Sequence, residues 1–129
     1  MVIKIVVGFT LIEVLISLLL LSSILIGFDA FCIHSLRGIR NTFFFVQATN
    51  QVMSMEERLI ALKNHAGIDE QIRIWNVENA KVLPQGFGKV EGVYPQYTVQ
   101  IFWGNKKPPC ENTQIGNNGC IKEYFEAIM

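Results

Sequence analysis

The longest uninterrupted pattern in the chain is an apolar run near its N-terminus. No charged residue occurs from Val14 to Phe28, and residues 9–28 as a whole have the composition of a membrane-spanning helix and nearly its length. We expect residues 9–28 to form this span, with Phe28 and Phe31 near its outer edge, because aromatic side chains gather at membrane interfaces.

After Asp29 the pattern becomes amphipathic, and residues 29–66 are predicted to continue the same helix. No proline precedes Pro84, and we expect the helix to end near His65, where Gly67 can cap its C-terminus. One helical row begins apolar and becomes mixed, and a second row carries the apolar face onward. The first row is Leu36, Ile39, Phe43, Val46, Asn50, Met53, Glu57, Ile60 and Lys63, and the second is Val52, Met55, Leu59 and Leu62.

Three adjacent aromatic residues, Phe43–Phe45, lie within the amphipathic part of this helix. Successive side chains on a helix turn by about 100°, so the three rings cannot all face one core. Either one or two of them pack under the folded domain and the remainder contacts a neighbouring subunit, or the domain's own sheet and loop cover all three. The sequence leaves both alternatives open.

A second, shorter helix is predicted at about Asp69–Leu83. Asp69 and Glu70 lie near its start, where the helix dipole favours negative charge, and Pro84 forces it to stop. Apolar residues recur at helical spacing along it and define one buried face. These residues are Ile68, Ile72, Trp75 and Val82.

Strand patterns separated by turn residues fill the rest of residues 67–129. The predicted strands are Phe87–Val93, Tyr97–Trp103 and Ile121–Ile128. In the second strand, alternate residues are expected to face one side, with Phe102 as an apolar exception on the other. The alternating residues are Tyr97, Val99, Ile101 and Trp103. The fold class expected is α+β, a small antiparallel sheet of about three strands laid on the long helix.

Charge and motif content argue against several functions. The 129 residues include 11 basic and 11 acidic ones without a basic stripe, so nucleic-acid binding is not expected. Lys106 and Lys107 form a local basic pair, which we interpret as solvated surface. His34, interpreted as a surface residue, and His65, interpreted as a helix cap, lie too far apart on one helix to share a ligand. We therefore expect no enzyme, cofactor, metal site or small-molecule substrate.

Cys110 and Cys120 stand close together in a stretch rich in Pro, Asn and Gly. If this part of the chain lies outside the cytoplasm, we expect them to form a disulfide. A metal site is the alternative, but the CxxC spacing and paired histidines of zinc sites are missing. Cys32, just past the apolar run, is interpreted as a small packing residue rather than a redox or lipidation site.

One carboxylate, Glu13, stands near the start of the apolar run. A carboxylate at membrane depth costs about 2.5–3.5 kcal/mol on insertion scales, so such residues usually mark function. The alternative is a signal-peptide core or an ordinary membrane anchor that happens to contain a glutamate.

The segment Gly8-Phe9-Thr10-Leu11-Ile12-Glu13, followed by the long apolar helix, resembles the N-terminus of type IV prepilins and their pseudopilin relatives. The resemblance implies that residues 1–8 are a leader peptide and that a prepilin peptidase cuts between Gly8 and Phe9. It also implies that Phe9 becomes an N-methylated N-terminus. Glu13 would be the glutamate that fixes subunit register, by pairing with the Phe9 amine of a neighbouring subunit.

A narrower resemblance, to the PilV family of minor pilins, is carried by a block of the C-terminal domain. That block contains Trp75, Val77, Leu83-Pro84-Gln85-Gly86-Phe87-Gly88, Tyr97, Val99, Ile101 and Trp103. The two resemblances imply a pilin-like fold with a C-terminal disulfide loop. They also imply a non-catalytic minor type IV pilin that assembles with other minor pilins and the major pilin, and that initiates or enters the pilus.

The location expected from this resemblance is the inner membrane, crossed once, and the pilus after assembly. Lys4 favours a cytoplasmic N-terminus and a periplasmic C-terminal domain, although Arg37 and Arg40 beyond the span partly oppose that orientation. A minor pseudopilin of a type II secretion system is the alternative function, because both families share the N-terminal motif. A DNA-uptake or adhesion pilin is a third reading, against which the neutral charge argues.

Overall fold

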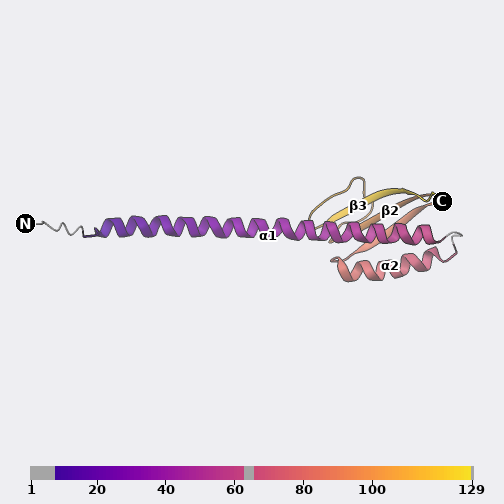
Figure 1. Cartoon of the computed structure of the whole chain (residues 1–129), viewed down its shortest axis with the longest axis horizontal. Coiled ribbons are helices and arrows are strands. Elements are labelled where there is room, and N and C mark those ends of the chain that lie inside the picture. The colour runs from indigo at the N-terminus through magenta and orange to yellow at the C-terminus, as the bar shows by residue number, and fades with distance from the viewer. Residues whose placement is uncertain (1–7, 63–65, 129) are drawn as a thin grey trace, which may run out of the picture. The chain divides into compact units, whose positions relative to one another are not determined.

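The computed structural model describes residues 8–62 and 66–128 (Figure 1). Its elements are helices α1 (Leu11–Ala61) and α2 (Ile68–Val82) and strands β1 (Phe87–Val93), β2 (Gln96–Trp103) and β3 (Gly119–Glu126). Contacts divide the chain into two compact units, Met1–Arg37 and Gly38–Met129. The first unit contains the N-terminal part of α1, and the second contains the rest of α1, α2 and the sheet.

In the first unit, α1 is apolar and exposed on all sides. Its start is marked by the Thr10 carbonyl, which accepts the N–H groups of Glu13 at 3.0 Å and Val14 at 3.3 Å. The helix is long and apolar enough to cross a membrane in this region. Three serine hydroxyls within it donate to backbone carbonyls of the preceding turn, and therefore need no water. These bonds are Ser17 to Glu13, Ser22 to Leu19 and Ser23 to Leu20, at 2.8–2.9 Å.

In the second unit, one face of α1 packs on one face of the sheet and forms the core. The α1 residues are Ala48, Val52, Met55 and Leu59, and the sheet residues are Tyr97, Val99, Ile101, Trp103 and Ile121. The predicted alternation along β2 is therefore confirmed. Phe102 lies on the opposite face, where it is buried with Cys110 and Cys120.

The sheet is antiparallel with the order β1-β2-β3, so β2 is central and both other strands are edges. Gly88 and Ile121 both pair with Ile101 from opposite sides. β3 begins at Gly119 and ends at Glu126, slightly earlier at both ends than the sequence predicts. Beyond it the Ala127 N–H still donates in register to the Pro95 carbonyl at 2.8 Å, but Pro95 has no N–H to return the bond, so the ladder ends there.

α2 lies beside α1 and is fixed to it by two polar contacts. The Trp75 indole N–H donates to the Gln51 carbonyl at 2.8 Å, and Arg58 binds Glu78 at 2.7 Å. Val82, expected on the buried face, is exposed. The chain becomes extended at the next residue, Leu83, whose side chain enters the core in its place.

The bounds of α1 differ from the predicted ones. The helix begins at Leu11 rather than residue 9 and ends at Ala61. The cap expected at His65 and the leader residues before Gly8 lie outside the described residues. The first row is exposed from Leu36 to Ile60, because the second row is the one that faces the sheet. Its exposed apolar members are Leu36, Ile39, Phe43, Val46, Met53 and Ile60.

The three adjacent aromatic residues of α1 separate, and two of them pack on the core as the first alternative predicts, while the contact of the third with a neighbouring subunit stays a prediction. Phe44 and Phe45 pack against the core, whereas Phe43 remains 53% exposed. Phe43 touches Phe44 edge to face, with ring centroids 5.9 Å apart. The domain's own sheet and loop therefore do not cover all three rings.

Candidate functional site

The predicted processing and assembly residues lie at the beginning of α1. Gly8 and Phe9 precede the helix, and the Phe9 side chain is 81% exposed. Glu13 lies in the first turn, where the helix dipole favours negative charge. Within the part of the chain that the structure describes, the Glu13 carboxylate has no hydrogen-bond or ion-pair partner. The arrangement presents one carboxylate on an apolar surface, open to a cation from elsewhere.

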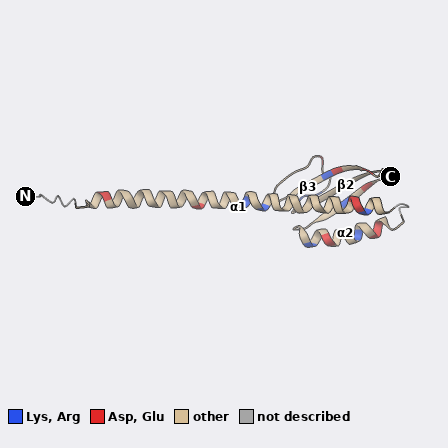
Figure 2. Cartoon of the chain, in the orientation of Figure 1, with Lys and Arg blue, Asp and Glu red and all other residues tan. Residues whose placement is uncertain are grey.

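Charge is sparse over the N-terminal part of α1 and frequent in the C-terminal domain (Figure 2). Glu13 and Asp29 are the acidic residues of α1 before Arg37, and the side chains between them are uncharged. Cys32 is half-buried and free, while His34 is exposed as expected. A carboxylate surrounded in this way by apolar residues is costly in a membrane or a helix bundle unless a cation compensates it.

The disulfide expected in the C-terminal domain is present between Cys110 and Cys120. Both residues are buried against Phe102 on the face of the sheet that is turned away from the core. Gln114, inside the loop, exchanges two backbone bonds with Cys120 at 2.8 and 3.2 Å. The disulfide and this bridge fix the loop to the sheet.

The loop is also attached to α1. Arg40 donates to the Asn117 side-chain oxygen at 2.6 Å. In the same loop, the Gly116 carbonyl accepts the indole N–H of Trp103 at 2.9 Å. The loop that the disulfide closes is therefore held by the helix and the sheet at once.

The block around Trp75 and Gly88 fixes α2 to the sheet. The Trp75 ring lies against Gly88, where any Cβ would overlap it. The Asn76 amide accepts the Gly88 N–H at 2.6 Å and donates to the Gly88 carbonyl at 3.1 Å. The Asn76 side chain thus occupies the edge of β1 as a neighbouring strand would.

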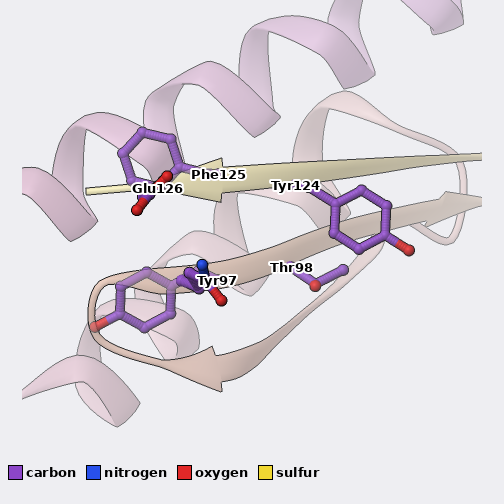
Figure 3. A pocket seen from close by; sticks show the side chains of 6 residues that line it. Tyr97, Thr98, Tyr124, Phe125 and Glu126 are labelled. Atoms are coloured by element: carbon purple, nitrogen blue, oxygen red, sulfur yellow. The ribbon is translucent and has the colours of Figure 1, made fainter. Parts of the chain in front are cut away.

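A hollow of about 550 Å³ lies at the end of the sheet where β2 begins and β3 finishes (Figure 3). Thr98 and Tyr124 pair across the two strands, as do Tyr97 and Phe125. Burial, with a smaller contribution from Tyr94, raises the pKa of Tyr97, so its hydroxyl stays protonated at neutral pH. The hollow is open, and both polar and apolar side chains line it.

A second depression, which we call the α1–β3 groove, has a volume of about 250 Å³. Its lining residues are Phe45, Thr49, Val52, Met53, Glu56, Thr113, Ile121 and Glu123. Burial and, to a smaller extent, the Glu123 charge raise the pKa of Glu56. Sequence reasoning missed this pair, because Glu56 and Glu123 lie far apart in the chain. The alternation Ile121, Glu123, Phe125 could have placed Glu123 on the helix-facing side of β3.

Comparison of the chain with protein-family models, with curated proteins and with solved structures finds no match. Functional interpretation therefore depends on the residues and their geometry. Among the described residues, no group of three or more His, Cys, Asp or Glu side chains could hold a metal ion. The features that call for a functional explanation are the exposed apolar helix with its single early carboxylate and the domain that follows it.

Proposed function

We propose that this chain is a minor type IV pilin, a non-catalytic subunit that enters or primes a pilus. The observation that carries the proposal is the position of Glu13 in the first turn of an exposed, apolar helix, directly after Gly8-Phe9. A soluble domain has no use for such a surface. A subunit that is stored in a bilayer and then packed among similar helices needs one.

In this mechanism a prepilin peptidase cuts after Gly8 and releases the Phe9 amine, which is then methylated. The Phe9 amine of one subunit and the Glu13 carboxylate of its neighbour compensate each other in the apolar filament interior. Removing either partner leaves an uncompensated charge, at a cost of about 3–5 kcal/mol for a buried pair. The pair therefore acts chiefly as a register device between the subunit, the major pilin and other minor pilins.

The exposed row on the second half of α1 supports the same proposal. Within the second unit it comprises Ile39, Phe43, Val46, Met53 and Ile60, which are 49–65% exposed. Their successive spacings of four, three, seven and seven residues keep them on one side of the helix, as in a helix-packing seam. A helix that meets other helices in a filament would cover this row, whereas an ordinary membrane anchor would not require it.

The PilV-like block favours assignment of the chain to a type IV pilus over assignment to a type II secretion system. Its residues Trp75 and Gly88 form the contact that fixes α2 to the sheet, which supports a structural reason for that resemblance. The proposed orientation has a cytoplasmic N-terminus, a single inner-membrane span and a periplasmic C-terminal domain, in which a disulfide such as Cys110–Cys120 is stable.

The test is to shear and quantify surface pili from cells that lack the gene, and from the same cells complemented with the intact gene. Loss of pili that complementation restores is the expected result. Normal pili together with reduced levels of exported enzymes would instead favour the secretion-system pseudopilin. Normal pili and normal export would overturn both assignments.

A further inference from the structure

The two edges of the sheet differ in whether a helix covers them. On one side of α1, α2 covers the edge of β1, and Asn76 binds both backbone groups of Gly88. On the other side, next to β3, no helix takes the equivalent place in the described residues (Figure 1). That side contains the α1–β3 groove.

The outer edge of β3 carries unpaired backbone groups. In an antiparallel ladder, alternate residues direct N–H and C=O to opposite sides. Cys120 directs both groups outward to Gln114, so Lys122 and Tyr124 direct theirs outward as well. No backbone partner meets them there among the described residues. An exposed strand edge of this kind is a template for an added strand.

The adjoining groove has a defined charge. Glu56 and Glu123 line it together, and neither has an ion-pair partner in the described part of the chain. The basic residues nearby are directed elsewhere. Arg58 binds Glu78 of α2, and the Lys122 ammonium lies 5.1 Å from the centre of the Tyr124 ring. The remaining walls of the groove are mostly apolar.

From these observations we infer that the β3 edge and the α1–β3 groove bind an extended segment of a partner protein that carries a basic residue. The segment pairs with Lys122 and Tyr124 through its backbone and directs one Lys or Arg side chain to Glu56 and Glu123. The groove, at about 250 Å³, is smaller than typical small-molecule pockets of roughly 300–1,000 Å³ and suits a single side chain.

A second copy of this chain fits the site less well than a basic segment. If two β3 edges pair so that Lys122 and Tyr124 exchange bonds, the two Glu123 side chains lie opposite each other. Like charges in directly opposed positions destabilise a strand pair. The inference concerns the second unit of the protein and does not depend on Glu13 or on the proposed pilus function.

The test uses the full chain in detergent micelles and a displayed library of random twelve-residue peptides. We expect selected peptides to contain one Lys or Arg flanked by apolar residues at alternate positions. The double variant Glu56→Gln/Glu123→Gln should weaken their binding by at least about tenfold, which corresponds to about 1.4 kcal/mol. Upon binding, the amides of Lys122 and Tyr124 should become protected from hydrogen exchange.

A matched pair of proline variants separates the edges. Tyr124→Pro removes an outward N–H from β3 and should abolish peptide binding, while Val90→Pro removes an outward N–H from β1 and should not. Should either proline variant fail to fold, the double Gln variant and hydrogen exchange still decide. Selection of peptides without basic residues, unchanged affinity in the double variant, or self-association of the chain through β3 would each overturn the inference.

Discussion

The ring of Trp75 on α2 lies against the α-carbon of Gly88 on β1, closely enough that no side chain fits between them. Trp75 is fully buried, and its indole N–H is bonded to Gln51 of α1. Because the ring is fixed by this bond, it cannot move aside without breaking it. One tryptophan therefore joins α1, α2 and the sheet.

Gly88→Ala should destabilise the C-terminal domain by about 1–3 kcal/mol, the usual cost of overfilling a packed core. The added methyl group would overlap the Trp75 ring and disturb its bond to Gln51. Gly116→Ala is the matched control, since the nearest atom to its added Cβ would be 3.7 Å away. Denaturant unfolding of the two variants measures the difference, and equal stability would refute the packing argument.

Removing the disulfide should weaken the domain without changing its fold. With Cys110 and Cys120 both replaced by Ser, the unfolded chain regains the freedom of the loop, at a cost of roughly 2–3 kcal/mol in the chain-entropy model. Arg40→Ala should add a smaller loss by releasing Asn117 from α1. Chemical denaturation of the wild-type protein with and without reductant checks the first expectation, and denaturation of the Arg40 variant checks the second. If the stability of the wild-type protein did not change with reductant, the first expectation would be contradicted.

The stability of the domain should depend on pH through Glu56. Its pKa is raised in the folded state by burial and by Glu123, so the folded state binds the proton more tightly than the unfolded state. The contribution of Glu56 is therefore most favourable at low pH, and it is lost as pH rises from the ordinary glutamate pKa through the raised folded value. Glu56→Gln should flatten this decline and stabilise the protein at pH 7.

Glu91 provides a control of opposite sign. Its ion pair with Lys89 lowers its pKa, so the stability from this pair is present above the ordinary pKa and is lost as pH falls through the lowered value. Glu91→Gln lacks this pair, so the variant should lose less stability than the wild type when pH falls from neutral to acidic. Thermal melts of both variants and of the wild type between pH 3 and 8, which is roughly the range where carboxylates titrate, measure these effects. Relative to the wild type, Glu56→Gln should become more stable as pH rises, and Glu91→Gln less stable.

Glu13→Ala should separate membrane insertion from assembly. Removing the carboxylate makes the span more apolar, so the variant should be processed after Gly8 and remain in the membrane. It should fail to enter filaments, because the Phe9 amine of the neighbour would have no partner. Glu57→Ala, a charge removal on an exposed position of the same helix, is the control. Normal incorporation of the Glu13 variant into sheared pili would refute the register role.

Sequence patterns predicted the sheet more accurately than the helices. Alternation placed Val99 and Ile101 inward and Phe102 outward, because a strand has only two faces. α1 was harder, since it has apolar residues on several faces, and only tertiary contacts decide whether Met53 or Met55 is buried. Asn76 could not be assigned to the β1 edge from sequence at all, because its bonds to Gly88 join two elements whose spacing is not local.

Candidate functional residues could likewise be proposed from sequence only where they are close together in the chain. Gly8, Phe9 and Glu13 stand within one short motif, and Cys110 and Cys120 close a short loop. Glu56 and Glu123 come from distant parts of the chain and meet only when α1 packs on the sheet. Such pairs are created by folding, and no pattern within one segment contains them.

The internal bonds of Ser17, Ser22 and Ser23 have a consequence for how this helix is recognised. With these hydroxyls turned to their own backbone, the segment offers a neighbour only shape and, at Glu13, one charge. Lipid chains and apolar side chains are nearly interchangeable as surroundings for such a surface, so exchange between them requires little energy in either direction. If Glu13 pairs with the amine of a neighbour as proposed, that one ionic contact has to provide the discrimination among neighbours within this apolar segment.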